Sequence, residues 1–147
     1  MDVREIATTN LKMATPQFAV RNVRDLLSNN DFRHVPIVDE ARGVVGLVSQ
    51  HDLSSSAAMA RQFGGGREGY ESFLEQPVDE FLKTRFGDRE GLVTITPGTS
   101  LREAAELMVS QKLTAIPVVE EDGELFGIVS YTDILRSSFD IADESAE

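Results

Sequence analysis

The chain has 147 residues, of which 25 are acidic and 14 basic, so its formal net charge is −11. This length allows one ordinary domain or two small ones, and the 41% of hydrophobic residues is enough to form a core. The acid excess argues against a general affinity for nucleic acids or anionic membranes, and the absence of cysteine excludes disulfides and thiolate metal sites.

Residues 1–56 contain a first set of predicted elements. A short amphipathic stretch leads into a helix whose apolar residues recur at helical spacing. Two β-branched runs around a polar turn predict a β-hairpin, and a serine then begins another helix. In chain order these are the stretch Val3–Ala7, the helix with Val20, Val23, Leu26 and Leu27, the strands Val35–Val38 and Val44–Val48, and the helix after Ser49.

Residues 77–138 contain a second set in the same order. Between the sets, residues 57–76 include three consecutive glycines and predict a connector with a flexible middle. Residues 139–147 hold too few apolar side chains to pack and predict an acidic tail. The second set consists of the stretch Val78–Leu82, the extended segment Leu92–Thr96, a helix with a Ser100/Glu103 capping box and the stripe Leu101, Ala104, Ala105, Leu107 and Met108, and the strands Ile116–Val119 and Leu125–Val129.

The two sets are copies of one unit. A shift of 81 residues aligns residues 11–53 with 92–134 without a gap, and twelve of the 43 pairs are identical. Ordinary residue usage gives about two or three matches by chance. The sequence Gly-x-Val-Ser-x-x-Asp occurs in both copies, at 46–52 and at 127–133. The chain is therefore expected to consist of two repeats of a mixed α+β unit.

The repeated Ser-x-x-Asp has a structural interpretation that needs no ligand. The serine hydroxyl caps a helix while the acid three residues later accepts from the serine amide. Gly46 and Gly127 are also expected to be structural, because glycine lets a strand pass close to its neighbour. The glycines at 64–66 lack the Gly-Lys-Ser/Thr of a phosphate loop. The acidic turns at 39–40 and 120–122 are expected to favour solubility rather than metal binding.

The strands 35–38 (VPIV) and 116–119 (IPVV) each contain a proline, Pro36 and Pro117, and Gly-x-Val-Ser-x-x-Asp follows the turn after each. Together these motifs resemble the CBS (cystathionine β-synthase) domain. Two in tandem resemble a CBS pair, or Bateman module, over about residues 3–138. The resemblance implies tandem CBS repeats (β-α-β-β-α units with a leading helix) packed as a pseudo-twofold sandwich with two related clefts. In the family such clefts often bind AMP, ADP, ATP or S-adenosylmethionine, and the proteins commonly form dimers through their helices.

The resemblance also implies which residues would hold the ligand. In similar proteins the aspartate accepts hydrogen bonds from ribose hydroxyls, and the serine lies near phosphate, where a helix N-terminus favours an anion. The first repeat carries more cations at these positions, so one site is preferred. The preferred site consists of Arg33, His34, Ser49, His51 and Asp52, with Thr84, Leu113 and Thr114 near the base. The weaker mirror site consists of Thr9, Phe32, Arg33, Ser130, Thr132 and Asp133.

Two departures from the family pattern affect this assignment. Asp31 and Lys112 stand where a glycine often precedes the proline-centred strand, which narrows the approach of the base. The second repeat also has about six extra residues within 84–91, the stretch expected to hold the base. For Arg33 and His34 the structural alternative is a solvated pair on an exposed edge.

The sequence therefore predicts a stand-alone regulatory CBS-pair protein that binds an adenosine nucleotide between its repeats and signals occupancy to an unknown partner. No catalytic constellation, metal site or required cofactor is expected, and a homodimer is the default. The alternative is a dimerisation or protein-interaction module with empty clefts. The N-terminal residues include no apolar stretch long enough for a signal peptide, and no window approaches the roughly 18 apolar residues of a membrane span, so a cytoplasmic location is expected.

Overall fold

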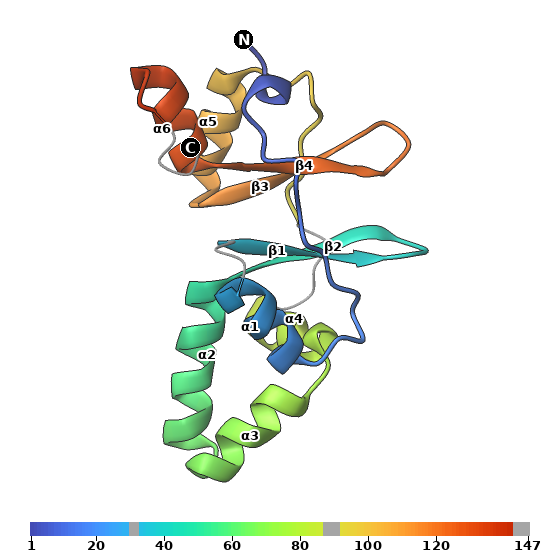
Figure 1. Cartoon of the computed structure of the whole chain (residues 1–147), viewed down its shortest axis with the longest axis vertical. Helices are drawn as coiled ribbons and strands as arrows, with labels where there is room; N and C mark the ends of the chain where they lie inside the picture. The colour runs from blue at the N-terminus through green and yellow to red at the C-terminus, as the bar shows by residue number, and fades with distance from the viewer. Residues whose placement is uncertain (30–32, 87–91, 143–147) are drawn as a thin grey trace. The chain divides into compact units, whose positions relative to one another are not determined.

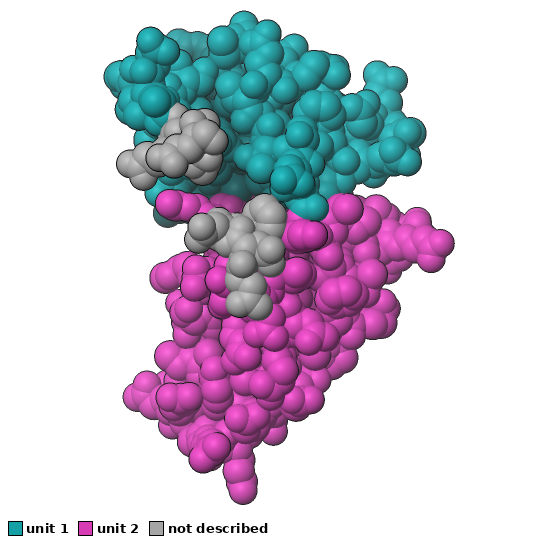
Figure 2. All heavy atoms as spheres, in the orientation of Figure 1, with its two compact units in different colours: residues 1–11, 93–147 teal, residues 12–92 magenta. Residues whose placement is uncertain are grey.

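The computed structural model describes residues 1–29, 33–86 and 92–142 and divides the chain into two compact units (Figures 1 and 2). Unit 1 consists of residues 1–11 and 93–147, and unit 2 of residues 12–92. The helices are η1 (Val3–Glu5), α1 (Val20–Asn29), α2 (Gln50–Phe63), α3 (Arg67–Glu75), α4 (Val78–Phe86), α5 (Leu101–Gln111) and α6 (Tyr131–Phe139). The strands are β1 (His34–Asp39), β2 (Gly43–Ser49), β3 (Ala115–Val119) and β4 (Leu125–Ser130).

Each unit is built on one antiparallel hairpin, β1–β2 in unit 2 and β3–β4 in unit 1, as the sequence predicts. The two hairpins share the same irregularity, because the register shifts after Ile37 in one and after Val118 in the other. A backbone bridge from Ala14 to Ile37 is likewise matched by one from Ile95 to Val118. These positions lie 81 residues apart, so the sequence repeat is also a repeat of backbone structure.

Unit 2 places its helices on one side of the β1–β2 hairpin (Figure 1). Val20, Val23 and Leu27 recur every three or four residues along α1 and form the buried side of that helix. They share a core with apolar residues of both strands and of the three other helices of the unit. Its buried members are Ala14, Val20, Val23, Leu27, Val35, Ile37, Val48, Leu53, Leu74, Val78, Phe81 and Leu82.

Unit 1 packs α5 and α6 on its own hairpin. Ser100 caps α5, since its hydroxyl accepts a hydrogen bond from the Glu103 amide at 3.1 Å. Ala104 and Met108 of α5 join the core of the unit. Lys112, at a position where the family often has glycine, ends α5 with φ at 56° and ψ at 48°. This is the left-handed conformation that glycine adopts without steric cost.

The segment that leads each repeat packs in the unit built on the other repeat. Val3 is buried in unit 1, and its amide donates to the Thr99 carbonyl at 2.9 Å. In unit 2 the Val78 amide at the start of α4 donates to the Phe18 carbonyl at 2.7 Å. Unit 1 is therefore made of two separate stretches of the chain, whereas the predicted repeats are consecutive stretches. The repeat boundaries at 1–56 and 77–138 stay a prediction about the sequence.

Gly46 and Gly127 lie at close approaches, which confirms their structural interpretation. A Cβ on Gly46 would lie 2.8 Å from the Leu82 side chain of α4. A Cβ on Gly127 would lie 2.6 Å from the carbonyl oxygen of Thr8. Leu82 lies in α4, and Thr8 follows η1 by three residues, so the two glycines make room for the leading segments against the hairpins.

Residues 57–76 hold the end of α2 and all of α3, with the glycines in the turn between them. The positive φ values of 99° and 68° at Gly65 and Gly66 explain why glycine stands there. α3 packs against the rest of unit 2 through Leu74, which is 2% exposed. Within the described residues, no helix is both long and apolar enough to cross a membrane.

Candidate functional site

The Ser-x-x-Asp of the first repeat forms the N-terminal cap of α2. Ser49 has extended backbone angles, φ −102° and ψ 161°, at the point where β2 ends. Its hydroxyl accepts a hydrogen bond from the Asp52 amide at 3.1 Å, and its own amide donates to Asp52 Oδ2 at 3.1 Å. The capping-box interpretation is therefore confirmed, and it holds both side chains at the helix N-terminus.

The hairpin brings basic side chains of the first repeat to this cap. His34, the first residue of β1, pairs directly with Ser49 across the hairpin. Side chains of such a pair lie on the same face, about 5 Å apart. Arg33 precedes the strand and is exposed, and His51 is exposed in the first turn of α2. We call this group, Arg33, His34, Ser49, His51 and Asp52, the Ser49 corner.

The chemistry of the Ser49 corner suits a ligand with an anion and hydroxyl groups. An arginine and a protonated histidine donate hydrogen bonds to anions, and the positive end of the α2 dipole favours negative charge. A carboxylate such as that of Asp52 accepts hydrogen bonds from hydroxyl groups. Asp52 and His34 each also interact with groups of the protein itself, so a ligand would share these side chains with existing contacts.

The second repeat has the same cap with fewer charges. The Ser130 amide donates to Asp133 Oδ2 at 2.8 Å, and the Ser130 hydroxyl accepts from the Asp133 amide at 3.2 Å. That hydroxyl also lies 2.8 Å from the Thr132 hydroxyl and donates to Asp133 at 2.9 Å. Ala115 occupies the place of His34 opposite Ser130. The polar groups of this corner thus bond to one another, and the cations are replaced by neutral side chains.

The other predicted ligand residues are spread over both units. Thr84 is exposed on α4 of unit 2. Thr9 and Thr114 are exposed and Leu113 is half-buried in unit 1. Phe32 lies outside the described residues, as do Asp31 and positions 87–91 of the extra stretch. The part that these residues play in binding stays a prediction.

In each of the acidic turns at 39–40 and 120–122, an aspartate accepts a hydrogen bond from a nearby backbone amide. Asp39 accepts a hydrogen bond from the Ala41 amide at 2.8 Å, which lowers the pKa of the Asp39 carboxyl. Asp122 accepts from the Glu124 amide at 3.0 Å in the corresponding turn of the second repeat. In the part of the chain that the structure describes, no cluster of three carboxylate or histidine side chains is arranged to hold a metal ion.

One feature that the sequence did not predict is a cavity of about 190 Å³ between α1, α2 and α3. Its lining includes Leu27, Ser28, Gln50, Ser54 and Tyr70. The apolar spacing of Tyr70, Phe73 and Leu74 indicates a helix with one apolar side. Only the tertiary structure shows that the apolar side of α3 packs on α1 and α2 and leaves this cavity.

Comparison with known proteins gives a family match in both repeats. The CBS domain model matches residues 3–58 and 88–140. The chloroplastic CBS domain-containing protein CBSX2 of Arabidopsis thaliana is 28% identical over 153 residues, which cover 92% of this chain and 62% of CBSX2. Its relative CBSX1 is 30% identical over 149 residues, which cover 90% of this chain and 61% of CBSX1. The chain thus spans about three fifths of the length of these relatives.

Solved structures show the same fold. The crystal structure of CBSX2 in complex with AMP has a TM-score of 0.66 and 22% identity, and the match covers 95% of this chain and 97% of that chain. The CBS domain pair of protein MJ0100, in complex with 5′-methylthioadenosine and S-adenosyl-L-methionine, has a TM-score of 0.69 and 19% identity, with coverages of 97% and 98%. At these identities the likeness establishes the fold alone.

Proposed function

The chain belongs to the CBS domain family, and from this premise we propose that it is a regulatory CBS-pair protein that binds an adenosine compound at the Ser49 corner. The observation that carries the proposal is the pairing of His34 with Ser49 beside Arg33 and His51. Adenosine compounds are also the ligands named for CBSX2 and for the MJ0100 domain pair. Adenosine compounds contain a ribose, and the nucleotides among them also contain phosphate. These are the two groups that the side chains of the Ser49 corner suit.

Each residue of the Ser49 corner has a distinct part in the proposal. Asp52 accepts hydrogen bonds from the ribose hydroxyls, and Ser49 with the α2 N-terminus faces the phosphate. Arg33, His34 and His51 supply positive charge. AMP, ADP and ATP are the ligands of first choice, with S-adenosylmethionine as the alternative. Thr84, Leu113 and Thr114 are proposed as the residues near the base.

The corresponding corner of the second repeat is proposed as a weaker site. Ser130, Thr132 and Asp133 keep the cap, but the positions of His34 and His51 are taken by Ala115 and Thr132. With less positive charge, we expect lower affinity for a phosphate there. Thr9, Phe32 and Arg33 are the remaining residues of this proposed site.

A regulatory role without catalysis fits the relatives. The match to inosine-5′-monophosphate dehydrogenase of Aquifex aeolicus covers 82% of this chain but only 21% of that enzyme, so the activity of the enzyme does not transfer to the chain. We propose that the protein is a homodimer that passes ligand occupancy to a regulated protein. The cytoplasmic location stays a prediction, since CBSX1 and CBSX2 are named as chloroplastic.

Ligand titration tests the proposal directly. AMP, ADP, ATP and S-adenosylmethionine are each added to the full chain, and binding is followed by calorimetry and by thermal unfolding. A ligand at 100 times its Kd stabilises the folded state by about 2.7 kcal/mol. For a protein of this size we expect the Tm to rise by roughly 5 to 10 °C. Absence of binding by all four at millimolar concentration would favour the alternative, a module for protein interaction alone.

A matched pair of variants identifies the site. Asp52→Ala and Asp133→Ala remove the same half of a capping box, so they weaken their helices to a similar degree. Asp52→Ala is expected to weaken the tighter of the two binding events by about 10- to 100-fold, because hydrogen bonds to a charged group contribute about 1.5–3 kcal/mol, whereas Asp133→Ala should leave that event unchanged. Equal losses of affinity in the two variants would contradict the preference for the Ser49 corner.

A further inference from the structure

The cavity between α1, α2 and α3 is separate from the Ser49 corner. It measures about 190 Å³, and the described residues that line it include none of the five that form that corner. Protein interiors are close-packed and seldom contain a void much larger than a water molecule. A space of this size among three helices of one core is therefore a candidate binding site.

Short side chains on α1 and α2 leave this space open. Ser28 lies near the end of α1, and Ser54 and Ala57 lie about one turn apart on α2. Side chains this short leave the gap between the helices unfilled. At the 81-residue offset, the second repeat has the larger Val109 and Leu135 in place of the two serines. The repeated unit therefore does not require short side chains at these positions.

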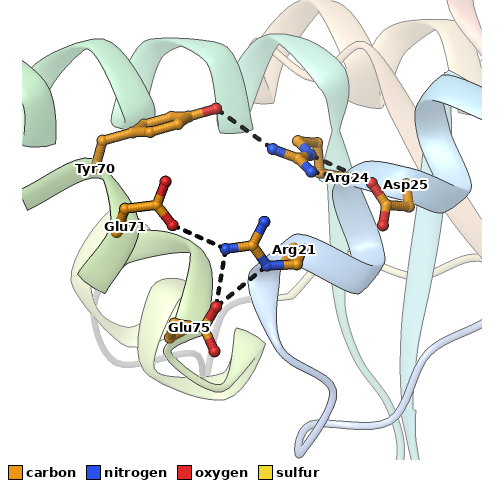
Figure 3. Close-up of polar contacts among 6 residues, drawn as sticks. All are labelled: Arg21, Arg24, Asp25, Tyr70, Glu71 and Glu75. Atoms are coloured by element: carbon orange, nitrogen blue, oxygen red, sulfur yellow. Dashed lines mark hydrogen bonds and ion pairs between the residues drawn. The ribbon is translucent and has the colours of Figure 1, made fainter. Parts of the chain in front are cut away.

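α3 forms one wall of the cavity and is held on α1 by ion pairs. Arg21 of α1 binds Glu71 and Glu75 of α3 at 3.0 and 2.8 Å (Figure 3). These two carboxylates accept hydrogen bonds from the Arg21 guanidinium and hold its pKa above the ordinary value. Leu74 of α3 is buried in the same core. The walls are thus in place before a ligand binds, which lowers the ordering cost of binding.

The inner part of the cavity is apolar. Leu27, Leu53 and Leu74 line it, one from each helix, and each is at most 5% exposed. Phe73 of α3 adds an aromatic ring to the lining. Such a surface favours the apolar part of a ligand, because transfer of apolar area out of water is favourable.

The outer part of the cavity is polar. Ser28, Gln50 and Ser54 are exposed and supply two hydroxyl groups and an amide to the lining. Tyr70 of α3 adds a phenol hydroxyl. Hydroxyl and amide groups both donate and accept hydrogen bonds, so they suit a neutral polar group on a ligand.

The charges around the cavity favour an uncharged ligand. Among the described residues that line it, Arg24 alone is charged, and its charge is already paired. Its guanidinium binds Asp25 at 3.2 Å and donates to the Tyr70 hydroxyl at 3.4 Å (Figure 3). An anionic ligand would compete with Asp25 for this guanidinium, and a cationic ligand would be repelled by it.

We propose that this cavity binds an uncharged compound with one aromatic ring and one hydrogen-bonding group, such as a phenol. The ring lies among the leucines and Phe73, and the polar group faces Ser28, Gln50 and Ser54. An apolar protein cavity of about 150 Å³ holds benzene, so this one has room for a ring with one or two small substituents. The site is additional to the proposed adenosine site and does not depend on it.

Titration of the full chain with 4-methylphenol, followed by NMR of the backbone amides, tests the proposal. The largest shifts are expected at residues of the lining, such as Leu27, Gln50, Ser54 and Tyr70. A ligand of this size makes few contacts, so we expect a Kd of about 0.1–1 mM. Toluene, which lacks the hydroxyl group, should bind about 3-fold more weakly or worse. Benzoate, which carries a charge, should bind about 10-fold more weakly or worse.

A matched pair of variants locates the bound ring. Ala57→Leu places a larger side chain in the cavity, whereas Ala58→Leu makes the same change at the next residue of α2, which is exposed. The Kd for 4-methylphenol should rise about 10-fold or more in Ala57→Leu and stay unchanged in Ala58→Leu. Thermal unfolding checks that both variants fold. Ser54→Leu blocks the cavity from an exposed position and gives the same test if Ala57→Leu proves unstable.

Three results would overturn the proposal in different ways. If 4-methylphenol causes no shifts at millimolar concentration, the cavity is not a ligand site. If benzoate binds as tightly as 4-methylphenol, the preference for an uncharged ligand is wrong. If Ala57→Leu and Ala58→Leu have equal effects, the ring binds elsewhere. The titration with adenosine compounds is a separate measurement, so the two proposed sites can fail independently.

Discussion

Ser49 and Ser130 show how one residue can serve both fold and site. Each caps a helix through the same two hydrogen bonds with the aspartate three residues later. The cap places the aspartate at a helix N-terminus, where the dipole favours an anion. What differs is the residue across the hairpin, His34 in one repeat and Ala115 in the other. The proposed preference for one site therefore depends on neighbours of the motif rather than on the motif itself.

Gly46 and Gly127 give a prediction at the scale of single residues. Their alanine variants overpack the hairpins at the leading segments, and overpacking typically costs about 1–3 kcal/mol. The Cβ of Gly127→Ala would meet the Thr8 carbonyl, a backbone atom, whereas that of Gly46→Ala would meet the Leu82 side chain. We expect Gly127→Ala to lower the free energy of unfolding more, as measured by urea denaturation. A larger loss for Gly46→Ala would contradict this.

At the scale of elements, α3 is the feature that distinguishes the repeats. The glycine turn at 64–66 ends α2 and lets α3 fold back on α1 and α2. A Cβ on Gly69 would lie 2.3 Å from the Gly64 carbonyl oxygen, so glycine is also needed where α3 leaves the turn. The segment between the repeats is thus part of the core of unit 2 rather than only a tether.

Leu74→Ala tests this role of α3. Leu74 is 2% exposed, and truncation of a buried leucine costs about 2–5 kcal/mol. Ser72→Ala, on the exposed side of the same helix, should change the free energy of unfolding by less than about 0.5 kcal/mol. Urea denaturation of both variants gives the comparison. Equal effects would mean that α3 does not pack on unit 2.

At the scale of the whole molecule, the chain passes from one unit to the other and back. Residues 1–11 belong to the unit of the second repeat, and α4 belongs to the unit of the first. Thr8 and Ile128 exchange two backbone hydrogen bonds, at 2.9 and 3.0 Å. Each repeat therefore depends on a segment that precedes the other repeat in the sequence.

Removal of residues 1–10 tests this dependence. The deletion takes away the buried Val3 and the hydrogen bonds between Thr8 and β4. We expect hydrogen exchange to quicken most in β3, β4 and α5, and above all at the Ile128 amide, which loses its acceptor. The amides of β1 and β2 should change less, although they follow the deletion more closely in the sequence. A greater loss of protection in β1 and β2 would contradict the exchange of leading segments.

The sequence alone determined the repeat, the hairpins and the caps at Ser49, Ser100 and Ser130, and the resemblance of its motifs to the CBS domain implied the fold. The hairpins and caps follow from local patterns, because alternation, turn residues and capping are set by neighbours within a few positions. Tertiary structure alone decided that α3 covers the first repeat, that Val3 packs with the second, and that His34 pairs with Ser49 in a definite register. Such contacts join apolar faces that lie far apart in the sequence. Local sequence does not select among them, because many pairings of faces with similar hydrophobicity are possible.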